Sequence, residues 1–220
     1  VGTAFKAGAA AAMVQKGYSV AAEDRNVVAV DNTEKAMGDI AAGIIRERGN
    51  SLIKVAVTGS VGKTSTKDMI AFVLAQKYKT LKSKLNHNNE LGLPLTVMGL
   101  EKEHQVLVAE MGMRGMGQIE YLTNIVKPDI AVITNIGVAH LELLGSRENI
   151  LKAKLEVCKG MKADSTLVLN GDNDMLSQEN IVRNILSEYG VTCPKIIYFG
   201  TEDNSDYKAE NIHGSNYLLF

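Results

Sequence analysis

A lysine and a hydroxyl residue follow a glycine turn at Gly62-Lys63-Thr64, and this grouping is suited to holding phosphates. The turn comes after an apolar run at 52–57 and before a helix-like segment at 66–74. Backbone N–H groups in such a turn, together with the positive end of the following helix dipole, attract anions. Lys63 supplies a cation for the β- and γ-phosphates, and the Thr64 hydroxyl can ligate Mg²⁺. The sequence therefore predicts a nucleoside triphosphate site.

The glycine spacing of this loop differs from the common phosphate-binding pattern. Gly-x-x-x-x-Gly-Lys-[Ser/Thr] would place its first glycine at position 57, where Val57 stands, whereas the glycine falls at Gly59. The strand before the loop and the helix after it still favour a phosphate loop over an ordinary strand-to-helix turn. The predicted loop contacts with nucleotide are Thr58, Gly59, Ser60, Gly62, Lys63, Thr64 and Ser65.

Polar residues also follow two other apolar runs. The run at 105–110 ends in Glu110, and the run at 129–134 leads into Asn135 and then His140. Ligands of parallel sheets bind beyond the carboxyl ends of the strands, so these ends should meet the phosphate loop. Glu110 is then a candidate Mg²⁺ ligand and Asn135 a nucleotide contact, while His140 by itself would be an ordinary loop histidine. The glycines within 112–117 do not match a dinucleotide fingerprint and predict a flexible loop.

The elements that must position these residues alternate between strands and helices. Strands are predicted at 52–57, 78–81, 105–110, 129–134, 166–169 and 195–199. Those at 105–110 and 129–134 are near-continuous apolar runs, as is typical of a buried parallel sheet. Helices are predicted at 66–74, 117–127, 146–159 and 176–189. We therefore expect an α/β fold over 51–220, a P-loop three-layer sandwich with a mostly parallel sheet and helices on both faces.

Residues 1–49 are predicted to form a separate α/β piece. A helix is expected over 5–14, ending near Gly17, and a short strand over 26–30. A second helix should start at Thr33 and end at 48–50, where a domain boundary is expected.

Bulk properties favour an ordinary globular protein. With 45% hydrophobic residues, 22% charged residues and a net charge of −1, the 220-residue chain can bury a core but has no attraction to nucleic acid or an anionic membrane. Cys158 and Cys193 match no disulfide or zinc pattern. No signal peptide or membrane-length apolar run is found, so we expect a cytoplasmic protein. Because the chain opens at Val1 without an initiator methionine, we also expect a fragment of a longer protein.

The longer motifs resemble those of one enzyme family, the Mur ligases, whose ATP loop has a similarly offset glycine. The resemblance rests on residues 58–65, 86–96, 110–112, 121–125, 128–137, 139–142 and 153–156. It implies that 1–49 is the end of a UDP-substrate-binding N-terminal domain. It further implies that 51–220 is a truncated central ATP-binding domain and that the C-terminal domain is absent, so we expect this fragment alone not to turn over.

Within the family, residues 86–96 and 110–112 resemble the dipeptide-adding ligases. This implies an ATP-dependent amide ligase that joins D-alanyl-D-alanine to UDP-N-acetylmuramoyl-tripeptide through an acyl phosphate, in peptidoglycan precursor synthesis, as a monomer. ATP and two Mg²⁺ ions are the implied cofactors. Because two anions meet in the first step, screening by cations is the main catalytic need.

The resemblance also implies a role for each site residue. Thr64 and Glu110 would hold one Mg²⁺, Lys63 would screen the phosphates, and His140 would ligate the second Mg²⁺. Lys154 matches a lysine that is carbamylated in the family, and the resulting anion would help to hold the second ion. From the residues alone, Lys154 is predicted to be a helix-surface lysine.

Three further positions have roles by resemblance only. Asn88 and Asn89, with the glycine-proline turn that follows them, would face the substrate. Val61 stands where the family usually has asparagine, which removes a polar side chain near the phosphates. The adenine-contacting asparagine of the family would lie beyond Phe220.

Alternative functions stay open. A sister Mur ligase or a folylpolyglutamate synthetase would use a similar loop, and a non-catalytic module could bind ATP without forming amides. Glu110, His140 and Lys154 argue against the non-catalytic module, because simple nucleotide binding needs no second metal site. Whether the tripeptide carries lysine or diaminopimelate is also open.

Overall fold

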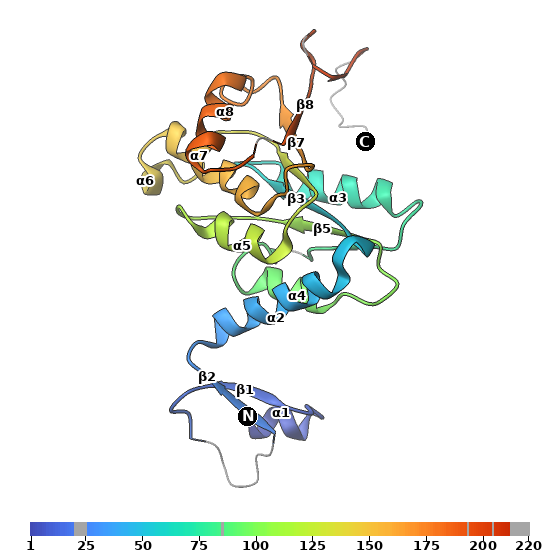
Figure 1. Ribbon diagram of the computed structural model, residues 1–220, viewed down its shortest axis with the longest axis vertical. Helices are drawn as coiled ribbons and strands as arrows, with labels where there is room; N and C mark the ends of the chain where they lie inside the picture. The colour runs from blue at the N-terminus through green and yellow to red at the C-terminus, as the bar shows by residue number, and fades with distance from the viewer. Residues whose placement is uncertain (20–25, 85, 193, 204, 212–220) are drawn as a thin grey trace, which may run out of the picture.

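A computed structural model describes residues 1–19, 26–84, 86–192, 194–203 and 205–211. The N-terminal part is small and lies to one side of the main body (Figure 1). There, helix α1 (Gly2–Lys6) precedes two short parallel strands, β1 (Ala12–Gln15) and β2 (Val27–Val30). Helix α2 (Thr33–Arg48) then leads to the main body.

The helix predicted over 5–14 is wrong, whereas the strand at 26–30 and the helix from Thr33 are confirmed within a residue or two. α1 ends at Lys6, and Gly8 then turns the chain with a φ of 95°. Alanine favours helix locally, but the backbone of β1 finds its hydrogen-bond partners in β2, which lies far along the chain. Such a non-local partner overrides local propensity.

One seven-stranded parallel sheet forms the centre of the main body as described, in the order β4-β5-β3-β6-β7-β8-β9. Its strands are β3 (Ile53–Thr58), β4 (Thr80–Lys82), β5 (Val106–Glu110), β6 (Ile130–Ile133), β7 (Thr166–Asn170), β8 (Lys195–Gly200) and β9 (Tyr207–Lys208). The predicted α/β fold is confirmed.

Helices cover both faces of this sheet (Figure 1). Helix α3 (Lys63–Leu74) packs on one face, where Val55, Val57 and Val108 form a small core. The larger core lies on the other face beneath α2, α4 (Gly92–Met98), α5 (Gln118–Val126), α7 (Arg147–Leu155), α8 (Glu179–Glu188) and the 3₁₀ turn η2 (Glu156–Gly160). Alternate residues of each buried strand therefore serve two different cores.

The strand order predicts that a ligand would bind at the carboxyl end of β3. β3 lies between β5 and β6, and the chain moves to one side of β3 for β4 and to the other side for β6. Ligands bind at such a switch point, beyond the carboxyl ends of the strands. The register pairs Val57 with Glu110 and Thr58 with Ile133, so the three strands end level with one another.

Three short elements differ from the sequence prediction. The glycine-proline turn after Asn89 is in fact the start of α4, and the Asn89 Oδ1 accepts a hydrogen bond of 2.8 Å from the Gly92 N–H. Pro94 is tolerated there because the first turn of a helix needs no N–H donor. Helix α6 (Leu141–Leu144) and strand β9 were not predicted, since each is too short to show a period.

Helix α2 packs against α4 and α5, and its buried Ala41 and Ile45 belong to the larger core. Residues before the predicted boundary near position 50 thus contribute to the main body, while the boundary itself stays a prediction. In the described part of the chain, the helices lack the combination of length and apolar character that crossing a bilayer requires.

Gly160 is expected to tolerate no side chain. A Cβ on Gly160 would overlap the carbonyl and hydroxyl oxygens of Thr123 in α5. Gly160→Ala should therefore lower the free energy of unfolding by about 1–3 kcal/mol. Gly43→Ala in α2 is the matched control, since its Cβ would meet only the end of Arg46, at 3.9 Å. Urea unfolding followed by circular dichroism measures both, and equal midpoints would contradict the packing described here.

Candidate functional site

The phosphate loop connects β3 to α3. Gly62 has a φ of 77°, in the left-handed region that favours glycine, and α3 begins at the next residue. The first N–H groups of a helix have no acceptor within it, so those at the start of α3 can donate to an anion. The Lys63 Nζ lies over the loop, donating to the carbonyls of Gly59 at 3.0 Å and Ser60 at 3.3 Å.

Residues after β6 hold this loop in shape. The Asn135 Oδ1 accepts hydrogen bonds from the N–H groups of Ser60, at 3.1 Å, and Val61, at 2.9 Å. The Thr134 hydroxyl donates to the Val61 carbonyl at 2.6 Å. The structure thus places Asn135, predicted to touch nucleotide, against the loop backbone. The N–H groups nearer α3 are the ones left to face a phosphate.

Thr134 also explains the offset glycine. A Cβ on Gly59 would overlap the Thr134 hydroxyl, and Gly59 has a φ of 147°. Close approach of the two strand ends therefore requires glycine at position 59. Thr58, also predicted to touch nucleotide, is fully buried, and its hydroxyl donates to the Met111 carbonyl at 2.8 Å. No side-chain hydrogen bond is found for Ser65 among the described residues.

Glu110, at the end of β5, meets Thr64 as predicted. Its side chain is 2% exposed, and Oε2 accepts a hydrogen bond of 2.9 Å from the Thr64 hydroxyl. The other oxygen, Oε1, accepts one of 2.8 Å from the Asn88 amide. The Glu110 N–H donates to the Ser83 hydroxyl at 3.1 Å. The Glu110 carboxylate thus joins the start of α3 to the 86–90 loop, while its backbone N–H ties it to Ser83, just after β4.

The Thr64 and Glu110 oxygens fit one edge of a Mg²⁺ site. Neighbouring ligands of an octahedral Mg²⁺ with bonds of about 2.1 Å lie about 3.0 Å apart, close to the 2.9 Å seen here. No group of three His, Cys, Asp or Glu side chains capable of holding a metal occurs among the described residues. A Mg²⁺ ion here would therefore share its remaining positions between phosphate oxygens and water.

A cleft of about 440 Å³ opens beside this carboxylate. Four residues that were predicted to belong to the site line this cleft: Lys63, Asn88, Asn89 and His140. The same cleft is lined by Glu90, Arg114 and Gln118, to which the sequence analysis gave no role. For Arg114, the sequence did contain a signal: it is an arginine in a glycine-rich loop that directly follows the end of a predicted strand.

The loop that carries Arg114 is held by hydrogen bonds, contrary to the flexible loop predicted. The Gln118 Oε1 accepts from the N–H groups of Arg114 at 2.5 Å and Gly115 at 3.1 Å. At its far end, the buried Glu156 accepts from the Gly117 N–H at 2.7 Å. Arg114 is thereby kept at the cleft.

Lys154 is not on the helix surface, contrary to the prediction from its residue pattern. It is 1% exposed, and burial, with a smaller contribution from Lys63, lowers its pKa to about 7. Its side chain forms no ion pair or hydrogen bond with the described residues. Burial and the cations Lys154, Lys63 and Arg114 likewise lower the pKa of His140 below its usual value. Three basic side chains, Lys63, Arg114 and His140, thus line one cleft, and the buried Lys154 interacts electrostatically with two of them, an arrangement suited to anions.

Lys67 was also missed. It lies one helical turn after Thr64, is 2% exposed, and its Nζ lies 3.9 Å from the Glu110 Oε2. The available signal was spacing, because residues three apart share a helix face.

Comparison with known proteins decides the family. The model of the Mur ligase middle domain matches residues 57–217, which is most of the chain. The chain belongs to the Mur ligase family. The resemblance inferred from the motifs is therefore confirmed.

Several relatives of this Mur ligase chain are named for the same activity. The chain is 39% identical to the UDP-N-acetylmuramoyl-tripeptide–D-alanyl-D-alanine ligase of Bacillus subtilis, over 96% of this chain and 43% of that protein. It also resembles MurF of Acinetobacter baumannii, with a TM-score of 0.79 and 31% identity over 92% of this chain and 41% of that one. A third match is Thermotoga maritima MurF in complex with ADP, with a TM-score of 0.74 and 31% identity over 90% of this chain and 43% of that one. The chain spans less than half the length of each.

Burial of Lys154 should make stability depend on pH. Unfolding restores the ordinary lysine pKa of 10.5, so between about pH 7 and 10.5 the unfolded chain binds one proton more. Stability therefore rises with pH across that window. Lys154→Met, which has no amine to bury, should be more stable near pH 7 by up to about 5 kcal/mol, and the gain should shrink toward pH 10.

Urea unfolding from pH 6 to 10 in CO₂-free buffer measures this difference. Lys152→Met is the control, because Lys152 lies on the same helix, is 39% exposed and pairs with Glu188. A gain for Lys154→Met that does not vary with pH would contradict the burial of an unpaired amine.

Proposed function

We propose that this chain is the nucleotide-binding and acyl-activating part of a ligase that joins D-alanyl-D-alanine to UDP-N-acetylmuramoyl-tripeptide at the expense of ATP. The observation that carries the proposal is the Thr64–Glu110 contact, set between a phosphate loop and a cleft rich in basic side chains. The names of the relatives support the choice of substrates. By the same comparison, residues 1–49 would be the end of a UDP-substrate-binding domain and 51–220 part of the central ATP-binding domain.

The reaction requires two anions to approach each other. A carboxylate oxygen of the tripeptide attacks the γ-phosphorus of ATP, and ADP leaves. The amine of D-alanyl-D-alanine then attacks the acyl carbon, loses a proton, and the C–O bond to phosphate breaks. Lys63 would screen the phosphates, while Arg114 would face the carboxylate across the cleft. These charges are in place beforehand, so little reorganisation is needed as the anions meet.

Thr64 and Glu110 would hold one Mg²⁺. Bound there, the ion would neutralise phosphate charge and orient the oxygens of the triphosphate. Asn88 donates to the Glu110 Oε1, so its proposed role is to orient that carboxylate at the edge of the cleft. Asn89 and Gln118 also line the cleft, and because their side-chain oxygens accept backbone hydrogen bonds, it is their amide N–H groups that would contact substrate.

Lys154 would be carbamylated. In that reaction the neutral amine adds to CO₂ and releases a proton, which gives an N-carboxylate. A lysine whose burial brings its pKa to about 7 is largely a neutral amine slightly above that pH. The anion formed would lie near the basic side chains of Lys63 and His140, which interact with Lys154 electrostatically. This modified form would offer a second Mg²⁺ an anionic ligand beside His140.

The deciding experiment offers different amines to a full-length protein that contains this chain. With ATP and UDP-N-acetylmuramoyl-tripeptide present, release of phosphate should depend on D-alanyl-D-alanine. Diaminopimelate or glutamate as the preferred acceptor would indicate a sister ligase or a folylpolyglutamate synthetase. Nucleotide binding without turnover for any acceptor would indicate a non-catalytic module. The proposed protein works as a monomer in the cytoplasm, which gel filtration and fractionation would test.

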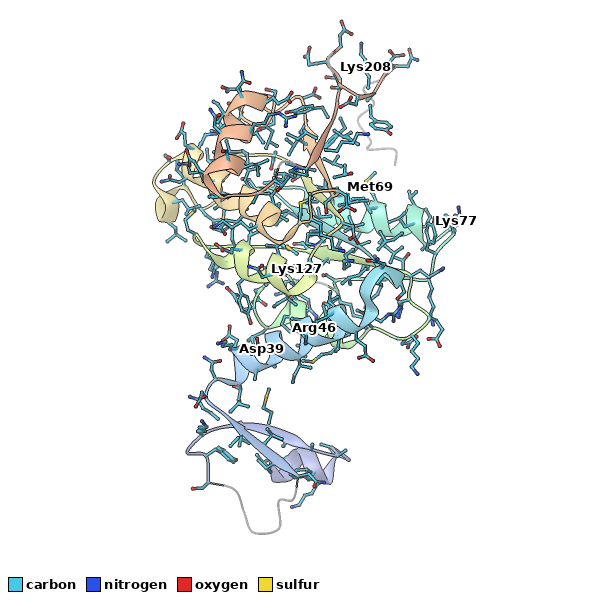
Figure 2. All side chains as sticks on the ribbon, in the orientation of Figure 1. Asp39, Arg46, Met69, Lys77, Lys127 and Lys208 are labelled. Atoms are coloured by element: carbon cyan, nitrogen blue, oxygen red, sulfur yellow. The ribbon has the colours of Figure 1, made fainter. Side chains whose placement is uncertain are left out.

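Lys63→Ala in the full-length protein should reduce the rate of ligation by about 10²–10³-fold, because a cation directed at developing phosphate charge is lost. Lys77→Ala is the matched control, since Lys77 is exposed in the turn that follows the C-terminal end of α3 (Figure 2). Steady-state release of phosphate measures both. Turnover by Lys63→Ala at the level of Lys77→Ala would refute the phosphate-loop assignment.

Lys154→Ala should abolish most ligation, and short carboxylates such as acetate should restore part of it by standing in for the carbamate. Lys152→Ala, in the same helix, should stay active and show no response to acetate. The wild type supplied with ¹³CO₂ should give a carbamate signal by NMR that Lys154→Ala lacks. Full activity of Lys154→Ala without any additive would show that no carbamate is needed.

A further inference from the structure

The oxygen that would ligate Mg²⁺ also takes part in a buried ion pair. The Lys67 Nζ lies 3.9 Å from the Glu110 Oε2, the same oxygen that accepts the Thr64 hydrogen bond. Both side chains of the pair are 2% exposed. Lys67 is held in place by a hydrogen bond of 2.9 Å to the Ser83 carbonyl, on the strand side of the site. Its ammonium group therefore has little freedom to move away from Glu110.

The other charges near Lys67 are balanced at the surface. Asp68 lies 3.3 Å from the Lys67 Nζ but also pairs with Lys82, at 2.7 Å, and both of these side chains are nearly half exposed. Within the described part of the chain, Glu110 forms no other ion pair. Lys67 is thus the counter-ion of Glu110, and the pair carries no net charge.

We propose that Lys67 makes metal binding depend on nucleotide, so that this site retains Mg²⁺ only together with phosphates. The inference rests on the proposed role of Glu110 as a Mg²⁺ ligand. A divalent ion on Oε2 would gain the attraction of one carboxylate but meet the repulsion of an ammonium held just behind it in a poorly solvated site. Phosphate oxygens of a nucleotide supply the missing negative charge. The metal and the nucleotide then bind with positive coupling.

The role of Lys67 in this scheme is positioning and charge balance, because it acts through Glu110 and touches neither substrate nor metal. A merely structural role would give a different result on removal of the charge, since a loosened carboxylate would bind metal more weakly. The proposal requires the opposite change in the affinity for the metal ion without nucleotide. Loss of the ammonium should strengthen binding of the bare ion and reduce its coupling to nucleotide.

Mn²⁺, which can be counted by electron paramagnetic resonance, is the probe on the full-length protein, with and without ADP. Wild type should bind Mn²⁺ weakly alone and much more tightly with ADP. Lys67→Met and Lys67→Gln should bind Mn²⁺ alone at least about tenfold more tightly and lose at least about tenfold of the coupling. Lys67→Arg should behave as wild type. Lys82→Met, which removes a neighbouring charge on the far side of Asp68, should leave the coupling unchanged.

Unchanged or weaker binding of bare Mn²⁺ by Lys67→Met and Lys67→Gln would overturn the proposal. Lys67→Gln keeps a donor for the Ser83 carbonyl, which protects the fold, and thermal unfolding checks it. Should neither neutral variant fold, the wild type still decides, because bare Mn²⁺ affinity within about tenfold of that with ADP would also overturn it. Glu110→Gln distinguishes failure of the Lys67 proposal from failure of the metal assignment on which it rests. If it leaves Mn²⁺ binding with ADP intact, the metal assignment itself is wrong.

Discussion

The hydrogen bond between Thr64 and Glu110 is the contact on which the site depends. It joins the start of α3 to the end of β5, so the phosphate loop and the neighbouring strand end are held at a fixed distance. The parallel register makes this possible, because Val57 and Glu110 are paired and the two strands end together. Asn88 brings the 86–90 loop to the same carboxylate. A shift of one residue in the register would turn Glu110 to the opposite face of the sheet.

Charge is arranged unequally around Glu110. Glu110 is joined through Asn88 to the cleft lined by Lys63, Arg114 and His140, and it pairs with the buried Lys67. A buried carboxylate without a partner is costly, and so is a buried ammonium, but as a pair each removes much of the other's penalty. The cleft, by contrast, has basic side chains in excess. This excess of positive charge does not stabilise the fold, and a bound anion would neutralise it.

Local pattern was enough to predict the parts of the fold whose signal is local. Apolar runs gave β3, β5 and β6, and the glycine turn before Lys63 gave the phosphate loop, because buried parallel strands and tight turns impose their composition directly. β1 was missed because its stability comes from a partner strand distant in the chain. Glu110 was found because it ends a strand. Lys67 and Arg114 were not found, because the role of each depends on residues that only folding brings close to it.

Lys154 shows the limit most clearly. Its neighbours in sequence are compatible with an exposed helix position, yet the side chain is almost wholly buried beside other basic groups. A lysine in that position destabilises the fold as long as it carries its charge, so the position contradicts the pattern that stability alone would favour. Such contradictions are expected where function sets the residue. Conversion to an anion would reverse the sign of its interaction with Lys63 and His140, so one covalent change would make a side chain that these neighbours destabilise into one that they stabilise.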